Sequence, residues 1–248
     1  MARVQSDNKR FFAIEVLPRS GTTILTNIFN SFENGFCFSE PIWQLIQDPW
    51  SIRLGKLNHQ IWPNSMRPEN MVSELKRVLE NNSYTIGGLK ETYRDWQTRC
   101  VDLINDDDLD FRIFIVRRPE FNFSGWKKTP FGAEYYDVDV FLRNYENFYK
   151  RIKDKSNRVP TYIVKYEQLC ASDDPLSYVG DMLRDQFGID GDLRLENTGY
   201  SYGDVKGNNS SKVERARSSF KNLTIKEANL CLDIGDLYGS LPEGLWLR

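Results

Sequence analysis

Residues 11–29, "FFAIEVLPRSGTTILTNIF", are the stretch of this sequence that decides the fold. The apolar run Phe11–Leu17 predicts a buried strand, and the apolar spacing over Thr22–Phe32 predicts a helix. A strand that turns through a glycine into a helix presents the free N–H groups of the first helical turn, which attract an anion. The stretch therefore predicts an anion-binding loop. It lacks the Gly-Lys-Ser/Thr of nucleoside triphosphatases and has an arginine before the glycine.

Strand and helix patterns alternate along the rest of the chain. Further strands are predicted at Phe36–Ser39, Tyr84–Leu89, Phe111–Val116 and Thr161–Tyr166. Helices are predicted at Pro68–Glu80, Asp95–Ile104, Val138–Ile152, Pro175–Phe187 and Ile225–Tyr238. This alternation predicts an α/β fold in three layers, P-loop-like, with a central, mainly parallel five-stranded sheet flanked by helices. Because no repeat or low-complexity linker interrupts the pattern, we expect residues 1–248 to form one domain.

Composition excludes several classes of protein. The 33 basic and 35 acidic residues nearly balance, which argues against a surface that coats nucleic acid or membrane. The N-terminus has no apolar signal region and no window approaches 18 apolar residues, so we expect a soluble cytoplasmic protein. The four cysteines form no C-x-x-C pair and are expected to be reduced core thiols. Basic residues nevertheless cluster at Arg112–Lys128 and Lys206–Lys221, where phosphates are expected below.

The loop after the first strand carries several anion-binding groups. Ligands of open α/β sheets bind beyond the carboxyl ends of the strands. Here Gly21 allows close backbone approach, and the amides of Gly21, Thr22 and Thr23 open the next helix. Arg19 adds a planar positive group. The alternative is a plain strand-to-helix junction capped by Ser20, which needs fewer of these residues.

Two segments resemble the nucleotide-binding motifs of one enzyme family. Residues 17–29, "LPRSGTTILTNIF", resemble the 5′-phosphosulfate loop of sulfotransferases that use 3′-phosphoadenosine 5′-phosphosulfate (PAPS). Residues 111–126, "FRIFIVRRPEFNFSGW", resemble the family's 3′-phosphate segment. The resemblance implies that Arg117 pairs with the 3′-phosphate, with a hydrogen bond from Ser124. The serine follows the arginine by seven residues instead of the family's usual eight, so Arg118 is a second candidate, and a plain surface pair is the alternative.

The resemblance extends to two later segments, and so covers the chain from about Phe11 to Asn222. Residues 161–169, "TYIVKYEQL", resemble the family's strand that ends in Tyr-Glu-Asp/Gln-Leu, where Tyr166 either faces the cofactor or packs as a half-buried side chain. Residues 207–222, "GNNSSKVERARSSFKN", resemble the loop that closes over the cofactor. By that resemblance Ser211 reaches the phosphosulfate and Lys221 the phosphate.

Sulfuryl transfer requires cations at the leaving oxygen and a base at the acceptor. Arg19 and Lys90, in "TIGGLKETY" (residues 85–93), are the candidate cations. Glu40, in "FCFSEPIW" (residues 36–43), is the candidate base. This set resembles the tyrosylprotein sulfotransferase branch, which implies that Arg19, Lys90 and Ser211 stabilise the transition state. The alternatives are an ordinary strand-end lysine and a helix N-terminal carboxylate.

The single histidine, His59, is the rival base, since cytosolic small-molecule sulfotransferases use a histidine. The overall prediction is a PAPS-dependent sulfotransferase that releases adenosine 3′,5′-bisphosphate and needs no metal. Its acceptor bears a hydroxyl or an amine, on a small molecule, a glycan or a peptide tyrosine; neither nucleic acid nor membrane is expected as a partner. The alternatives are a P-loop nucleotide kinase and a non-catalytic module that binds an adenosine bisphosphate.

Overall fold

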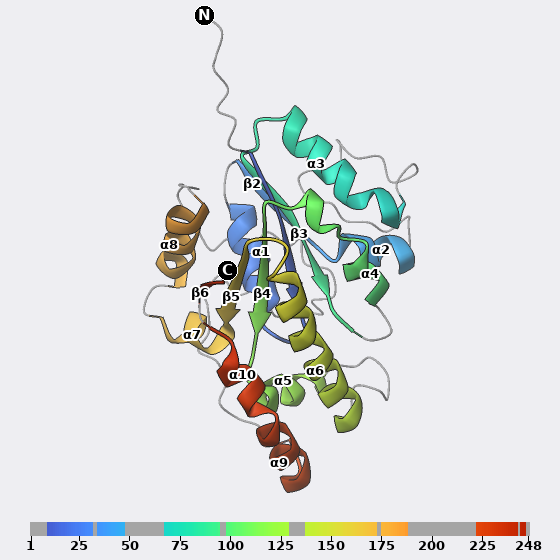
Figure 1. Ribbon diagram of the computed structural model, residues 1–248, viewed down its shortest axis with the longest axis vertical. Coiled ribbons are helices and arrows are strands. Elements are labelled where there is room, and N and C mark those ends of the chain that lie inside the picture. Colours follow the sequence, from blue (N-terminus) through green and yellow to red (C-terminus); the bar gives the residue numbers. More distant parts are fainter. Residues whose placement is uncertain are drawn as a thin grey trace, which may run out of the picture.

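A computed structural model describes residues 9–31, 34–47, 67–94, 98–128, 137–172, 175–187, 222–242 and 244–246. Its centre is a six-stranded sheet in the order β2-β3-β1-β4-β5-β6 (Figure 1). The strands are β1 Arg10–Val16, β2 Gly35–Ser39, β3 Ile86–Thr92, β4 Phe111–Val116, β5 Thr161–Lys165 and β6 Gly244–Trp246. Strands β1 to β5 are parallel, which confirms the predicted α/β fold, and β6 adds an antiparallel edge that the sequence pattern did not reveal.

Helices connect the parallel strands and cover both faces of the sheet. They are α1 Thr22–Ser31, α2 Pro41–Gln47, α3 Met71–Asn81, α4 Thr98–Asp102, α5 Pro119–Trp126, α6 Val138–Lys155, α7 Tyr166–Ala171, α8 Pro175–Phe187, α9 Ile225–Asp233 and α10 Gly235–Ser240. Short 3-10 turns lie at Pro68–Asn70 and Asp106–Asp108. The predicted helix Ile225–Tyr238 is divided in two at Ile234, and Tyr166 opens α7 instead of ending β5.

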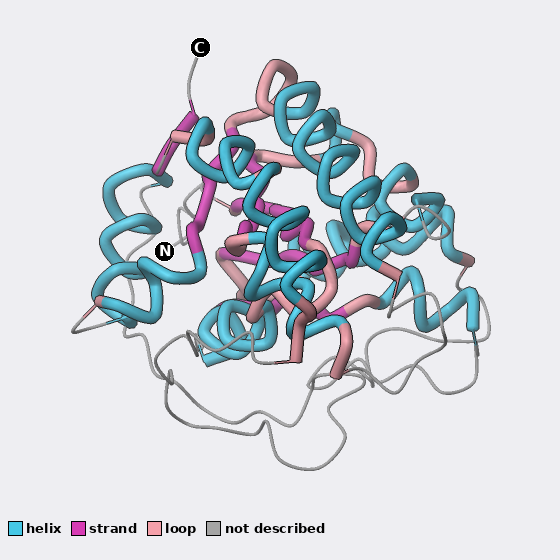
Figure 2. Tube along the Cα trace, turned by 90° about the horizontal axis from the view of Figure 1, so that it is seen from below, coloured by secondary structure: helices cyan, strands magenta, loops and turns pink. Residues whose placement is uncertain are grey.

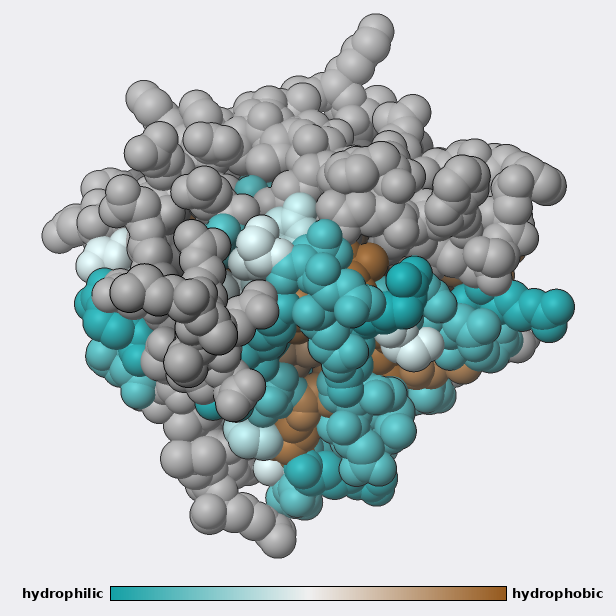
Figure 3. Space-filling model, turned by 90° about the horizontal axis from the view of Figure 1, so that it is seen from above, coloured by the Kyte–Doolittle hydropathy of each residue, from teal (hydrophilic) through white to brown (hydrophobic). Residues whose placement is uncertain are grey.

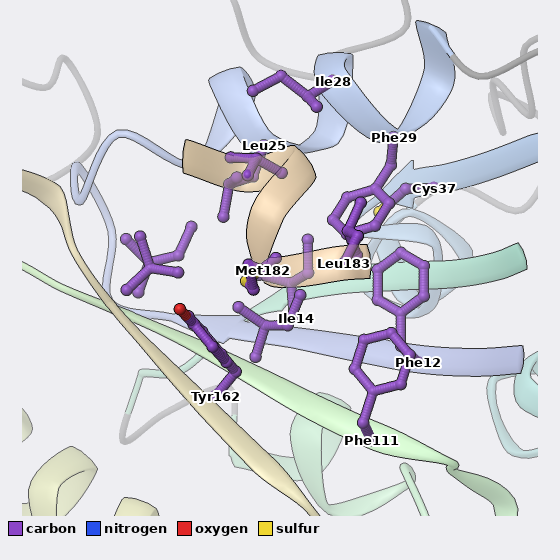
Figure 4. Close-up of a cluster of buried hydrophobic side chains, with 14 of the residues drawn as sticks. Phe12, Ile14, Leu25, Ile28, Phe29, Cys37, Phe111, Tyr162, Met182 and Leu183 are labelled. Atoms are coloured by element: carbon purple, nitrogen blue, oxygen red, sulfur yellow. The ribbon is translucent and has the colours of Figure 1, made fainter. Parts of the chain in front are cut away.

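One face of the sheet packs against α1 and α8. Alternate residues of β1 and β4, such as Phe12, Ile14 and Phe111, meet Phe29 of α1 and Leu183 of α8 (Figure 4). Successive strand side chains point to opposite faces, so the residues between them line the second face. There Phe11 and Ala13 pack against α2, α3 and α4, while Phe114 and Val116 pack against α5, α6 and α9.

Strand β3 runs further than predicted, from Ile86 to Thr92 rather than from Tyr84 to Leu89. It pairs with β1 from Ile86 to Thr92 and with β2 from Ile86 to Lys90, and the pair Val16–Thr92 marks its end. Lys90 therefore lies inside the strand, opposite Ser39, instead of following it. Gly87 leaves room for an aromatic ring, because a Cβ atom there would lie 2.3 Å from the ring of Phe36.

The fold places Arg112, a member of the Arg112–Lys128 cluster, where it cannot bind a ligand. Its side chain is fully buried on the α6 face and pairs with Glu15 and with Asp106 (Nη2–Oδ1, 2.5 Å). Arg151 of α6 completes the group through Glu15 (Nε–Oε2, 2.5 Å). A charge buried without a partner costs several kcal/mol, so this group holds α6 to the sheet and is structural.

The four cysteines, Cys37, Cys100, Cys170 and Cys231, are buried free thiols, as predicted. Among the described residues, no helix is both long and apolar enough to cross a membrane. At the amino ends of the strands, the coloured surface is mainly hydrophilic (Figure 3).

Candidate active site

The predicted site residues that the structure describes lie toward the carboxyl ends of the strands, the end of the sheet that Figure 2 views. The loop after β1, the turn after β2 and the end of β3 belong to neighbouring strands, since Val16 pairs with Thr92 and Ser39 with Lys90. The turn after β4 lies on the other side of β1. The sheet order thus brings four segments that are distant in the sequence to one edge.

The loop after β1 has an unusual backbone. Arg19 (φ 64°) and Gly21 (φ 83°) both adopt left-handed conformations, and α1 begins directly after them at Thr22. The Arg19 side chain is exposed, whereas Ser20 is buried. This geometry leaves an exposed cation next to the N-terminus of a helix, the arrangement that attracts an anion.

Helix α5 braces this loop through two residues that the sequence analysis missed. Asn122 Nδ2 donates to the Pro18 carbonyl (2.9 Å) and to Ser20 Oγ (3.1 Å). Trp126 Nε1 donates to the same carbonyl (2.9 Å). The two lie four residues apart on one helix, so they share a face. Only this spacing could have indicated them, because the resemblance assigned roles in this segment to Arg117 and Ser124 alone.

Tyr166 and Arg117 also contact the loop. A Cβ atom at position 21 would lie 1.9 Å from the Tyr166 ring, so this ring packs directly on Gly21. The guanidinium of Arg117 stands 4.8 Å from the centre of the same ring, and its Nη1 donates to the Arg19 carbonyl (2.9 Å). Arg117 Nε has no hydrogen-bond partner among the described residues and lies 4.0 Å from Glu167.

Arg118 points elsewhere. Its side chain is 48% exposed and pairs with Glu120 (Nε–Oε1, 2.9 Å). Its backbone N–H donates to Glu167 Oε1 (3.1 Å), whose other oxygen accepts from the Tyr238 hydroxyl (2.9 Å). Of the two arginines, Arg117 is therefore the one that contacts the loop.

Ser124 lies on α5, two residues beyond Asn122. Its hydroxyl donates to Asn222 Oδ1 (2.5 Å), and Asn222 Nδ2 donates back to the Ser124 carbonyl (3.0 Å). The next residue, Gly125, faces the loop, since a Cβ atom there would lie 3.0 Å from Arg19 Cβ. Ser124 thus joins the start of the C-terminal helical segment to the helix that braces the loop.

Glu40 sits in the turn between β2 and α2, and β3 holds it. Its backbone is left-handed (φ 54°), and its N–H donates to the Lys90 carbonyl (2.6 Å). Its Oε1 accepts from Lys90 Nζ (2.7 Å) and from Thr92 Oγ1 (2.5 Å). Thr92 was not predicted. Its contact with Glu40 can be inferred only once β3 is known to extend to residue 92. Thr92 and Lys90 then point to the same face of the sheet.

The charges around Glu40 keep it ionised. Burial raises the pKa of its carboxyl, but the positive charges of Lys90 and Arg94 and the hydrogen bonds from Lys90 and Thr92 outweigh burial, so the pKa falls below its ordinary value. A carboxylate that is ionised at neutral pH can accept a proton.

Several predicted residues lie outside the described residues: His59, Ser211, Lys221 and the basic cluster Lys206–Lys221. The backbones of Thr22 and Thr23 are described as the start of α1, but their side chains are not. No group of histidine, cysteine and carboxylate side chains suited to a metal ion occurs within the part of the chain that the structure describes.

Comparison with solved structures shows the fold of sulfotransferase domains. The sulfotransferase domain of the Synechococcus PCC 7002 olefin synthase is similar over 97% of this chain and 99% of that chain, with 17% identity and a TM-score of 0.62. A sulfotransferase domain from the curacin biosynthetic pathway is similar over 94% of this chain and 93% of that chain, with 13% identity and a TM-score of 0.52. No protein-family model matches the sequence, and no curated protein matches it.

Proposed function

We propose that this protein is a sulfotransferase that moves the sulfuryl group of PAPS to a hydroxyl or amine acceptor. The observation that carries the proposal is the Glu40 carboxylate, which Lys90 and Thr92 hold ionised at the same edge of the sheet as the Arg19–Gly21 loop. An anion-binding loop and a fixed base at one edge of the sheet are what transfer of an anionic group to a protonated acceptor requires. The fold shared with sulfotransferase domains agrees with it.

The residues around the loop fit a nucleotide with two anionic groups. The amides of Gly21, Thr22 and Thr23 and the exposed Arg19 would hold the 5′-phosphosulfate. Arg117 would hold the 3′-phosphate, because its guanidinium is already fixed on the Tyr166 ring and its Nε is an unused donor within the described chain. Ser124 would join it by exchanging its bond to Asn222 for one to the phosphate. Lys221 and Ser211 are proposed here by resemblance alone.

PAPS supplies the sulfuryl group, and the side chains of the protein orient the acceptor and stabilise charge. Glu40 accepts the proton of the acceptor, and Lys90 keeps Glu40 ionised until then. As Glu40 becomes neutral, the Lys90 ammonium loses its partner and is free to stabilise the negative charge that grows on the leaving oxygen. Arg19 acts on the same charge. General-base catalysis of this kind contributes about 10²–10⁴-fold in rate.

The acceptor is proposed to be a small molecule, a glycan or a peptide tyrosine. The set of Glu40, Lys90 and Arg19 is the one that resembles the tyrosylprotein sulfotransferase branch, and it makes Glu40 rather than His59 the proposed base.

A single experiment tests the function. The protein is incubated with sulfur-labelled PAPS and a mixed library of phenols, sugars, amines and tyrosine peptides, and labelled products are identified by mass spectrometry. We expect label in at least one acceptor class, and about 10²–10⁴-fold slower labelling with Glu40→Gln. Tight binding of adenosine 3′,5′-bisphosphate without any transfer would instead identify a non-catalytic binding module. Phosphate transfer from ATP would identify a kinase.

A further inference from the structure

Strand β3 carries a second carboxylate beside the Glu40 turn. Glu91 follows Lys90, and its side chain lies on the opposite face of the sheet, where it is fully buried. Its Oε1 accepts a hydrogen bond from the Ile42 N–H (2.6 Å). Its Oε2 has no hydrogen-bond partner among the described residues. A buried carboxyl oxygen without a hydrogen bond lowers the stability of the folded state. Its presence here points to a role for Glu91 other than packing.

We propose that Glu91 is a positioning residue, which caps helix α2 in place of Glu40 and so leaves the Glu40 carboxylate for the acceptor. The inference rests on the proposed function, because it assumes that Glu40 is the base.

The start of helix α2 explains the need for this cap. The Glu40 carbonyl accepts from the Gln44 N–H (2.9 Å), so Glu40 occupies the N-cap position of α2. An N-cap side chain ordinarily accepts from the N–H two or three residues further on. The Glu40 side chain instead points to Lys90 and Thr92, and Pro41 has no N–H. The first free donor of the helix is the Ile42 N–H, and Glu91 accepts from it.

The backbone of Glu40 explains why the cap matters for chemistry. A left-handed conformation in a residue other than glycine costs about 1–3 kcal/mol and persists only where its surroundings enforce it. On one side, the Lys90 carbonyl holds the Glu40 N–H. On the other side, Glu91 holds Ile42. Consecutive residues of one strand thus fix both ends of the turn that carries the proposed base.

The protonation state of Glu91 suits this role. Burial and the neighbouring Glu40 charge raise the pKa of Glu91 to about 8, although Lys90 and the backbone N–H groups of Ile42 and Trp43 oppose the rise. Glu91 is therefore mainly neutral at pH 7, and glutamine is a close substitute for it. Aspartate, which is one methylene shorter, keeps the acid but withdraws it from Ile42.

Two variants separate the hydrogen bond to Ile42 from the carboxyl group itself. In Glu91→Gln, we expect kcat within about threefold of the wild type, because the contact to Ile42 survives. In Glu91→Asp, we expect kcat to fall by about tenfold or more, since a small misplacement of a reacting group has effects of that size. Binding of adenosine 3′,5′-bisphosphate, followed by calorimetry, should stay unchanged in both. Wild-type kcat in Glu91→Asp, or an inactive Glu91→Gln beside an active Glu91→Asp, would overturn the proposal.

A matched control exists at the other end of the sheet. Asp110 Oδ2 also accepts a backbone N–H, from Phe11 (2.7 Å), far from the site. Asp110→Ala should lower the melting temperature and leave kcat unchanged. If it lowers kcat as much as Glu91→Asp does, the effect of Glu91 is general destabilisation and the proposal fails.

A readout without catalysis distinguishes this inference from the proposed function. Amide hydrogen exchange at Ile42 and the carboxyl titration of Glu40, both followed by NMR, should change in Glu91→Asp and stay as in the wild type in Glu91→Gln. If the wild type transfers no sulfuryl group, the proposed function fails while these measurements still test whether Glu91 positions Glu40. If they are unchanged in Glu91→Asp, the positioning role itself is refuted.

Discussion

The Nζ atom of Lys90 and the Oε1 atom of Glu40 lie 2.7 Å apart, although the two residues are separated by 50 positions in the chain. Both side chains are largely buried, with 5% of Lys90 and 14% of Glu40 exposed. A buried ion pair adds little net stability, because desolvation offsets most of the attraction. Its effect here is on protonation: Lys90 keeps Glu40 ionised, and Glu40 orients the ammonium.

Replacing Glu40 by glutamine tests the proposed base. The amide keeps the size and one acceptor oxygen but loses basicity. We expect adenosine 3′,5′-bisphosphate to bind almost normally and kcat to fall by about 10²–10⁴-fold. His59→Ala is the matched control and should lose little. Kinetics with a fixed acceptor decide the matter: an active Glu40→Gln beside a folded but inactive His59→Ala would transfer the role to the histidine.

Replacing Lys90 by alanine should alter both rate and pH dependence. The base works when ionised, that is, above its pKa. Without Lys90, burial acts on Glu40 against fewer positive charges, so its pKa rises and the acid limb of the kcat profile moves to higher pH. We also expect kcat to fall more than nucleotide affinity, because the Lys90 contact strengthens as the leaving oxygen becomes charged. An unchanged pH profile and rate would show that the ion pair has no role in catalysis.

Arg117 and Arg118 should differ in nucleotide binding. Arg117→Ala removes the guanidinium that lies on Tyr166 and contacts the loop, and we expect it to weaken binding of adenosine 3′,5′-bisphosphate by about 1.5–3 kcal/mol. Arg118→Ala removes a half-exposed partner of Glu120 and should cost much less. Isothermal titration of both variants checks this, and the reverse order would assign the 3′-phosphate to Arg118.

Adenosine 3′,5′-bisphosphate should raise the melting temperature of the wild type, as any ligand specific for the folded state does. ATP with Mg²⁺ should raise it much less, since it lacks the 3′-phosphate that Arg117 would bind. Differential scanning fluorimetry with both nucleotides is sufficient. Equal or greater stabilisation by ATP contradicts the proposed cofactor.

Gly21→Ala should damage the loop for two separate reasons. The backbone at position 21 is left-handed (φ 83°), and an added Cβ would collide with the Tyr166 ring at 1.9 Å. The left-handed conformation alone costs roughly 1–2 kcal/mol in a residue other than glycine. The double variant with Tyr166→Ala relieves the collision but not the backbone strain. Urea unfolding should therefore show partial rescue, and full rescue would mean that the backbone contributes nothing.

Local pattern was sufficient to predict most of the fold. Strand β4 and helix α8 have the predicted bounds, and the other parallel strands were found within a few residues, because buried strands leave apolar runs and their helices leave helical spacing. Strand β6 was missed because it has only three residues at an edge. Helix α2 was missed because, at seven residues, it is too short to show a period.

The sequence by itself determined which residues are candidates: the loop of Arg19 and Gly21, the acid Glu40, and the cations Lys90 and Arg117. Each lies at or next to the end of a predicted strand, and such an end is visible as the boundary of an apolar run. The tertiary structure decided which of them meet. It paired Lys90 with Glu40, turned Arg117 toward the loop and Arg118 away, and buried Arg112 with Glu15. It also supplied roles for Thr92, Asn122 and Glu91, which the sequence analysis did not single out. The physical reason is that register and sheet order set these contacts, and both depend on pairing between distant segments, which no local pattern records.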